Sequence, residues 1–545
     1  MCGFIVYENG ALFGDISQIV KRGPDSTSIT QGKFWTAVQS RLSCENEVDG
    51  TLPYHINGGS LFYNGEIYAD EQYGRLSDET EENFFEKLIR SESWPQKVVD
   101  SDGMFAIAFC TESSVTFFRD PLGIKPLFYS DPAENKFILG SSLPALLSSL
   151  GRDSNKVFDE DQIRDYFEMN KVCLEEKTFF SGIKTVEPGY IYRFDFETRA
   201  LTITPYASFP EFLAENAENQ SSKGKTSLVE ANKIRLHLQA LNETTVNRDR
   251  EATLLLSGGL DSQIVLHCLC QTDIDLDAQT WVLPSYEADL NHAIAAADQN
   301  GVVLHVKEYG ESLGEIIDLI KTTIDIIGMP PAGLNTCLSL GAFQDIKARG
   351  KKIVFSGDGA DEVFLGYGKY FMGEVGSKSL AYQDQKEDRS WIYGELLTRR
   401  KENNDLIGSK IRRSLQQIDH LSASNGLEVR FPFLRRSLLK LHSEITSVTK
   451  SMSNNHVGKP LLREAFSDVA ESGQTKRVKQ NPQTEFLHTR YRDEISQLIL
   501  TKSVEMKNIC KIEDLQTSLD RSMAMDSSLL TWQFLCLAIM FGAEL

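Results

Sequence analysis

The chain has 545 residues, of which 41% are hydrophobic and 25% charged, and its formal net charge is −20. Because single hydrophobic cores stop growing at about 250–300 residues, we expect two or three domains. The acidic balance argues against a nucleic acid or an anionic membrane as partner, since both need a concentrated basic face.

Nine cysteines occur singly with no CxxC pair, a pattern typical of a reducing compartment rather than of a disulfide framework. The first residues lack the basic and apolar regions of a signal peptide. The apolar stretch 529–541 is shorter than the about 20 residues that a membrane-spanning helix needs. We therefore expect a cytoplasmic protein in which this stretch forms a buried helix.

Up to about residue 206, short apolar runs alternate with turns. Runs rich in β-branched and aromatic residues, typical of strands, lie at 3–7, 60–63, 104–110, 115–118, 137–139 and 190–194. Helical patterns at 80–90 and 161–170 complete an α+β domain rich in antiparallel sheet. The polar stretch 210–226 indicates a linker, so we place the first domain at 1–206 and the linker at 207–226.

From residue 227 onward the pattern changes to strand, turn and helix. Predicted strands lie at 252–256, 280–283, 302–306 and 352–355, with helices at 262–270 and 290–300. Buried strands alternating with helices predict an α/β domain with a doubly wound parallel sheet. From about residue 390 the signal is mainly helical.

The sequence Ser-Gly-Gly-Leu-Asp-Ser at 257–262 follows one of these strands and opens a helix. Its glycines allow backbone N–H groups to converge on an anion at a helix N-terminus, as in a phosphate cradle. It is not a Walker loop, because GxxxxGK[ST] is absent. Asp261 can hold a magnesium ion that bridges phosphate oxygens.

A second loop, Phe-Ser-Gly-Asp-Gly-Ala-Asp-Glu at 355–362, also follows a predicted strand. It places three carboxylates at the end of the sheet where open α/β folds bind ligands. Because such close acids repel one another, we expect a metal ion or a substrate ammonium between them.

Several ordered motifs together resemble the glutamine-hydrolysing asparagine synthetases. They are Met1-Cys2-Gly3, 21–25, 41–43, 64–68, 102–106 and 119–123, then 257–262, 356–367, 427–434 and 458–463. The resemblance implies an N-terminal-nucleophile glutaminase domain with an αββα sandwich, followed by an ATP-pyrophosphatase (PP-loop) domain with extra helices. It also implies ATP and Mg²⁺ as cofactors, glutamine and a carboxylate acceptor as substrates, and a possible homodimer.

In the first domain the resemblance assigns a glutamine site. The Cys2 thiol attacks the side-chain amide after Met1 is removed, with its own α-amino group as base. The remaining roles fall to Asn64 and Gly65 as the oxyanion hole, Arg41 on the α-carboxylate, and Glu66 and Glu79 on the α-amino group. Glu79 takes the place of a family aspartate in an acidic run in which Glu81 is a further candidate.

In the second domain the resemblance assigns a nucleotide site. Leu256, Val282 and Gly357 match the adenine nucleotide region, and Ser257, Gly258, Gly259, Asp261 and Ser262 the pyrophosphate region, with Ser356 and Asp358 in the second loop. Asp261 and Asp361 match magnesium ligands. Lys459 matches a catalytic lysine that neutralises charge as an acyl-adenylate forms and pyrophosphate leaves.

Besides Glu79, and Asp358 in place of a family glutamate, three positions depart from the family pattern. Gln417 and His420 stand where relatives carry a cation that could meet the acceptor carboxylate, and Arg435 replaces an aspartate. Two explanations of these departures stay open: a loose alignment or ordinary drift, and a changed acceptor.

We therefore predict an ATP-dependent amide synthetase that uses glutamine, adenylates a carboxylate and releases AMP, pyrophosphate and glutamate, with asparagine as the default product. The alternatives are the same chemistry on another carboxylate, an intramolecular amide-forming cyclase, a thiolation enzyme or a non-catalytic binding protein. Cyclases usually lack the nucleophile, so intact Cys2, Arg41, Asn64 and Gly65 argue against that class.

Overall fold

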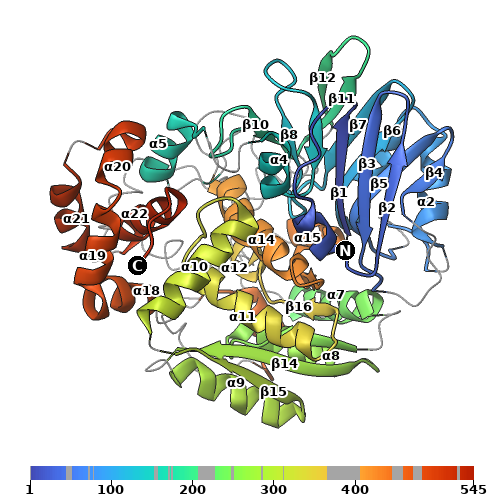
Figure 1. The fold of residues 1–545 in the computed structure, drawn as a ribbon. Helices are drawn as coiled ribbons and strands as arrows, with labels where there is room; N and C mark the ends of the chain where they lie inside the picture. Colours follow the sequence, from blue (N-terminus) through green and yellow to red (C-terminus); the bar gives the residue numbers. More distant parts are fainter. Residues whose placement is uncertain are drawn as a thin grey trace.

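The fold was taken from a computed structural model of the chain (Figure 1). It describes residues 2–44, 52–70, 74–77, 79–151, 157–169, 172, 176–206, 228–246, 251–283, 287–310, 312–364, 406–444, 458–469, 482–512, 514–524 and 528–545. The predicted linker at 207–226 and the motif residues 365–367 lie outside these ranges.

Residues 2–205 build two six-stranded antiparallel sheets. The first sheet has the order β10-β8-β9-β1-β3-β2, with bounds β1 Cys2–Glu8, β2 Ser26–Gln31, β3 Trp35–Arg41, β8 Phe128–Ser130, β9 Ile138–Gly140 and β10 Ile183–Thr185. The second has the order β12-β11-β7-β6-β5-β4, with bounds β4 Tyr54–Ile56, β5 Gly59–Ile67, β6 Gly103–Cys110, β7 Ser114–Arg119, β11 Tyr190–Asp195 and β12 Leu201–Pro205.

The two sheets pack face to face. Alternate residues of the strands point inward, so that Phe4, Val6, Phe62 and Phe117 belong to one buried cluster. The outer face of the second sheet is covered by α2 (Glu81–Ile89) and α3 (Trp94–Val99), and that of the first by α1 (Ser17–Arg22) and α4 (Leu143–Ser149). The predicted αββα sandwich is confirmed.

A five-stranded parallel sheet forms the core of the second half. Its order is β15-β14-β13-β16-β17, with bounds β13 Glu251–Leu255, β14 Asp275–Val282, β15 Val303–Glu308, β16 Ile353–Phe355 and β17 Glu428–Arg430. The chain order reverses beside β13, so the loops after β13 and β16 meet at a topological switch point. The predicted doubly wound sheet is confirmed.

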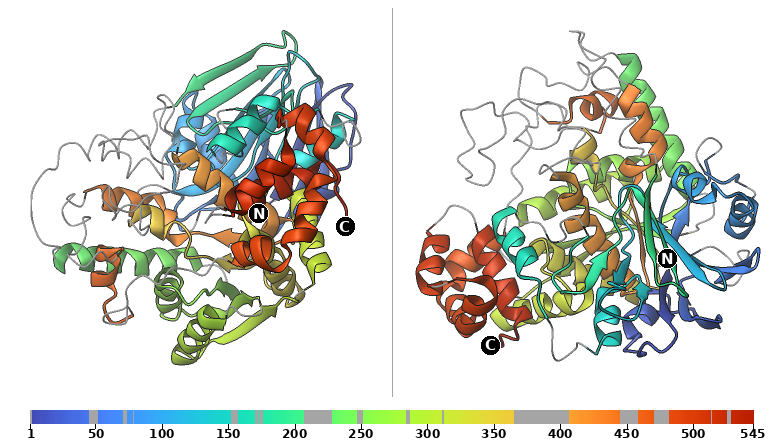
Figure 2. Two further views of the ribbon diagram at one scale, coloured as in Figure 1. Left: turned by 90° about the vertical axis from the view of Figure 1, so that its left-hand side faces the viewer. Right: turned by 90° about the horizontal axis from the view of Figure 1, so that it is seen from above.

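Helices surround this sheet. They are α7 Leu228–Val246, α8 Leu260–Leu269, α9 Glu287–Asn300, α10 Leu313–Ile327, α11 Leu334–Ala348, α12 Ala360–Val363, α14 Leu406–Ala423, α15 Arg436–Glu444 and α17 Pro460–Ala465. A C-terminal group consists of α18 Pro482–Glu485, α19 Arg492–Leu500, α20 Ser503–Cys510, α21 Leu515–Met523 and α22 Leu529–Met540. Figures 1 and 2 show this group gathered beside α5 (Glu160–Met169).

The described residues after 390 are mainly helical, as the sequence pattern indicates, but the strand β17 also lies among them. Its three residues are too few to show a strand period, and only their pairing with β16 makes them a strand. The predicted buried helix is confirmed as α22, whose residues from Thr531 to Met540 are all buried. Within the described part of the chain, we find no helix with the length and apolar character that crossing a bilayer requires.

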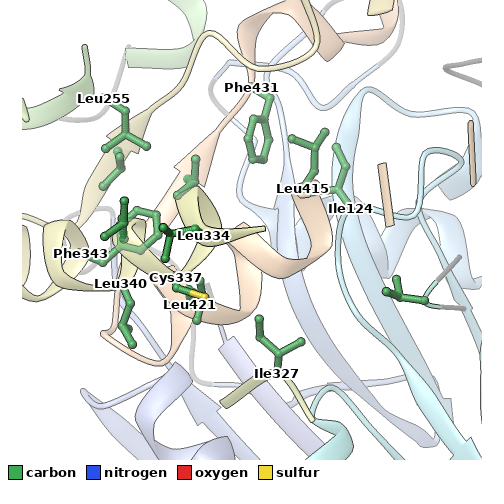
Figure 3. Close-up of a cluster of buried hydrophobic side chains, with 14 of the residues drawn as sticks. Ile124, Leu255, Ile327, Leu334, Cys337, Leu340, Phe343, Leu415, Leu421 and Phe431 are labelled. Atoms are coloured by element: carbon green, nitrogen blue, oxygen red, sulfur yellow. The ribbon is translucent and has the colours of Figure 1, made fainter. Parts of the chain in front are cut away.

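The two halves share one hydrophobic core. A single buried cluster contains Ile124 of the first half and Leu415 and Leu421 of α14 (Figure 3). The same cluster reaches the parallel sheet through Leu255. The interface between the halves is therefore an extension of the core, which holds their sites in fixed relation.

Candidate active sites

Cys2 lies at the start of β1 and is 5% exposed. The antiparallel register places Arg41 of β3 directly opposite Cys2. From the second sheet, Asn64 Oδ1 accepts a hydrogen bond of 3.2 Å from the backbone nitrogen of Cys2. Asn64 Nδ2 is buried and has no partner among the described residues, so it can donate to an oxyanion formed beside the thiol.

Gly65 follows Asn64 and needs to be glycine. Its φ is +148°, and a Cβ built there would lie 2.0 Å from the Met104 carbonyl oxygen. The close approach of β5 to β6 at this point therefore sets the position of the Asn64 amide.

The electrostatics of Cys2 favour a neutral thiol. Burial raises the pKa of the Cys2 thiol, and Glu81 raises it further. A hydrogen bond from the Leu42 backbone and the charge of Arg41 lower it by less. The thiol therefore needs a base at the moment of attack.

The acidic run holds two candidate carboxylates, Glu81 and the aligned Glu79, whose contacts differ. Glu81 Oε1 accepts hydrogen bonds from Tyr63 Oη (2.8 Å) and from the Ile67 backbone (3.0 Å). Glu79 Oε2 instead accepts from the backbone of Leu76 (3.2 Å). Glu81 is the first residue of α2, which turns its side chain back toward β5. Spacing within an acidic run could not distinguish the two carboxylates.

Glu66 connects the first site to the parallel sheet. Its Oε2 lies 2.9 Å from Arg430 Nη2, and Arg430 Nε also bonds Glu428 Oε1 at 3.1 Å. Burial alone would raise the pKa of Glu428, but Arg430 helps to hold it well below the usual range. The Arg430 carbonyl accepts from the backbone of Ser356 (3.0 Å), in the second loop.

The loop between β13 and α8 is held by its own serines. Ser262 Oγ donates to the Gly259 carbonyl (3.0 Å) and lies 3.2 Å from Ser257 Oγ. Gly258 has φ +71°, and a Cβ there would lie 2.7 Å from the backbone nitrogen of Ala293 in α9. The backbone therefore turns at the helix N-terminus as a phosphate cradle requires.

The loop after β16 packs against this turn. A Cβ at Gly357 would lie 2.9 Å from the backbone of Asp261 and Ser262. Ser356 Oγ donates to Asp358 Oδ2 (2.7 Å). Leu256 is buried after β13 and Val282 half-buried at the end of β14, so both lie at the carboxyl edge of the sheet.

Lys459 completes the second site. Its Nζ bonds Asp261 and lies 2.7 Å from Asp361 Oδ1, which brings together three residues far apart in sequence. Burial alone would lower the pKa of Lys459, but the two carboxylates outweigh it and raise it. The ammonium shows that a cation fits between these acids, and carboxylate oxygens are the donors that Mg²⁺ prefers.

The three departures from the family pattern are buried. Gln417 donates to the Pro330 carbonyl (2.9 Å) and accepts from the Ala332 backbone (2.7 Å). Burial, together with Arg22, lowers the pKa of His420 to about 3, so the ring is neutral. Arg435 Nε bonds Asp102 Oδ2 at 2.8 Å.

Two family models match the chain. A model described as a glutamine amidotransferase domain matches residues 1–207, and one described as asparagine synthase matches residues 233–418 and 409–541. The chain belongs to the asparagine synthase family. This family of ligases uses ATP, and the amidotransferase domain together with the synthase domain implies glutamine and a carboxylate acceptor.

Curated relatives span most of this asparagine synthase chain. Asparagine synthetase B [glutamine-hydrolyzing] of Escherichia coli (strain K12) is 25% identical over 478 residues, which cover 83% of this chain and 75% of the relative. The Homo sapiens asparagine synthetase [glutamine-hydrolyzing] is 24% identical over 478 residues, with 83% and 77% covered.

Among solved structures, the glutamine-dependent NAD+ synthetase of Acinetobacter baumannii aligns with a TM-score of 0.20 and 17% identity. That alignment covers 38% of this chain and 42% of the other. The fold assignment rests on the sheets described above.

Proposed function

We propose that this protein is a glutamine-dependent asparagine synthetase. Residues 1–206 hydrolyse glutamine at Cys2, and residues 227–545 adenylate the side-chain carboxylate of aspartate with ATP and Mg²⁺. Ammonia from the first site then attacks the acyl-adenylate, which yields asparagine and AMP. A homodimer is part of the proposal only by analogy with the family.

The observation that carries this proposal is the ion pair between Glu66 and Arg430. Glu66 lies two residues after Asn64, and Arg430 accepts the backbone hydrogen bond of Ser356 in the second loop. This pair therefore links the proposed glutamine site to the loop of the proposed nucleotide site, which supports one protein that runs both half-reactions.

Residues of this chain supply each role. Arg41 suits a bidentate contact to the glutamine α-carboxylate, and Asn64 Nδ2 suits the oxyanion. Glu66 and Glu79 are the acids proposed for the α-amino group, with Glu81 as a further candidate. At the second site Asp261 and Asp361 would hold Mg²⁺, which neutralises phosphate charge, while Lys459 stabilises the charge that develops on the leaving pyrophosphate.

The test is product analysis by mass spectrometry with ATP, Mg²⁺, aspartate and glutamine carrying 15N in its amide. We expect labelled asparagine and AMP. Cys2→Ala should lose this reaction but keep asparagine formation from ammonium ions, whereas Lys459→Gln should lose AMP release and keep glutamate formation.

Two results would contradict the proposal in different ways. AMP and a labelled amide formed only with another carboxylate would exclude aspartate as acceptor. Glutamate release that persists in Cys2→Ala would exclude Cys2 as the nucleophile.

A further inference from the structure

Asp419 of α14 is a carboxylate of the second half that lies against the first half. Its side chain is 2% exposed, and it meets two buried cations. Asp419 Oδ1 lies 2.8 Å from Lys125 Nζ, and Oδ2 lies 2.7 Å from Arg22 Nη2. Burial alone would raise the pKa of Asp419, but Lys125 and Arg22 lower it to about 2, so it carries a full negative charge at neutral pH.

Arg22 in turn lies along the backbone of the nucleophile. Its Nε donates to the Cys2 carbonyl at 3.4 Å. A Cβ at Gly3 would lie 3.1 Å from Arg22 Cβ and 2.7 Å from the Ile19 carbonyl oxygen, so α1 rests directly on the start of β1. Because a guanidinium is planar, the contact of Nη2 with Asp419 fixes the direction in which Nε points.

We propose that Asp419 is a positioning residue for glutamine hydrolysis, which acts by holding Arg22 against the carbonyl of Cys2. The inference rests on the proposed role of Cys2 as the nucleophile. It assigns to the synthetase half a residue that the glutaminase half needs, although Asp419 touches neither glutamine nor the thiol.

The two sides of α14 support this role. Asp419 and Gln417 are two positions apart, so their side chains leave the helix in roughly opposite directions. Gln417 holds the Pro330–Ala332 segment of the synthetase half, while Asp419 reaches Arg22 of the other. The helix that carries Asp419 is thus anchored on the synthetase side.

Two neighbouring groups provide matched controls. Lys125 binds the same carboxylate, and its backbone nitrogen donates to Asp120, so among the described residues it makes no hydrogen bond to Cys2. Asp102 forms another buried ion pair between the halves, with Arg435. Loss of either weakens the interface in the same manner while leaving Arg22 paired with Asp419.

The experiment measures glutamine hydrolysis by the full chain as kcat and KM, with ammonium-dependent AMP release as a second readout. We expect Asp419→Asn to lower kcat at least tenfold, with KM for glutamine changed less than threefold and AMP release retained. Lys125→Gln and Asp102→Asn should keep kcat within about threefold of the wild type. In the double variant of Asp419→Asn with Arg22→Gln, the losses should not add, because both act on one contact.

Three results would overturn the inference: wild-type kcat in Asp419→Asn, an equal loss in Asp102→Asn, or additive losses in the double variant. If Asp419→Asn does not fold, Arg22→Gln and Lys125→Gln give the same comparison, and equal losses in these two would overturn it. A wild-type protein whose glutamate release does not depend on Cys2 would overturn the proposed function itself, and the inference with it.

Discussion

At the scale of single residues, His420 shows how burial decides what a side chain can do. The family pattern leads us to expect a cation at the position of His420, and an exposed histidine could supply one at mildly acidic pH. Here the ring stacks on Phe128, with centroids 6.0 Å apart, and is 3% exposed. It therefore contributes packing at the interface rather than charge to a substrate.

This burial predicts an acid sensitivity. Burial, with Arg22 and Arg119, lowers the pKa of His420 to about 3, whereas the pKa in the unfolded chain is near 6.5. The unfolded chain binds the proton first as the pH falls, so the free energy of unfolding decreases below pH 6.5. The free energy of unfolding changes by about 1.4 kcal/mol per pH unit in this range. His420 therefore lowers it by about 2 kcal/mol between pH 6.5 and pH 5.

Urea unfolding of the wild type and of His420→Gln at pH 7 and pH 5 checks this prediction. Glutamine does not titrate, so the variant should lose about 2 kcal/mol less than the wild type over this interval. Loss of the ring contact with Phe128 changes the free energy of unfolding equally at both pH values, so it does not affect the comparison. Identical losses in the two proteins would show that His420 does not titrate as a buried neutral ring.

At the scale of elements, the site depends on how closely loops and helices approach one another. The turn after β13 approaches α9 at Gly258, and the loop after β16 approaches the same turn at Gly357. These contacts leave no room for a side chain, so glycines in the motif have a packing role besides their proposed role at the phosphates.

Gly258→Ala should lower the free energy of unfolding by about 2–4 kcal/mol. A left-handed alanine costs about 1–2 kcal/mol, and the new methyl group meets the backbone of α9. Gly259→Ala is the matched control, since Gly259 has φ −78° and its nearest neighbour would be Ser257 Oγ at 3.4 Å. Its cost should stay under about 1 kcal/mol. Equal costs in urea unfolding would contradict this account of the turn.

Adjacent glutamines on α14 provide a second comparison. Gln417 makes two hydrogen bonds to the segment before α11, whereas Gln416 is buried with an Nε2 that has no partner among the described residues. Gln417→Leu should cost about 2–4 kcal/mol, because it leaves two backbone groups without their partner.

Gln416→Leu should be neutral within about 1 kcal/mol, or stabilising, since it removes an unsatisfied donor. Thermal or urea unfolding of the two variants side by side gives the measurement. A larger loss for Gln416→Leu than for Gln417→Leu would show that the hydrogen bonds of Gln417 do not hold α14 in place.

At the scale of the whole molecule, the two halves behave as one body because their interface is both apolar and ionic. The hydrophobic cluster is continuous across it, and buried ion pairs join the halves at Arg22–Asp419, Glu66–Arg430 and Asp102–Arg435. Buried pairs add little net stability but are costly to break singly, so they fix the register of the halves.

Arg430→Met should therefore cost about 3–5 kcal/mol, because Glu428 would remain buried, and Glu66 half-buried, without their cation. KM for glutamine should rise several-fold, since Glu66 faces the proposed substrate. Arg90→Met is the control: its pair with Glu86 is exposed and should contribute less than about 0.5 kcal/mol. A cost as small for Arg430→Met as for Arg90→Met, in urea unfolding, would contradict a buried ionic link.

The placement of the two loops of the proposed nucleotide site could be predicted from the sequence, because strand, turn and helix follow one another within short windows. The loops at 257–262 and 355–362 lie where their flanking patterns placed them. Less of the proposed glutamine site could be predicted from local sequence patterns. Glu79 and Glu81 carry the same charge two positions apart, and only the start of α2 decides that Glu81 contacts β5.

The sequence by itself determined the class of each half, since hydrophobic period, turn residues and motif order are local properties of the chain. Only the tertiary structure decided which distant charges meet. Asp419 lies 397 positions from Arg22, and β17 becomes a strand only beside β16. The physical reason is that a buried ion pair or a strand pairing depends on a partner that no local window contains, and on the exclusion of water that only the packed core provides.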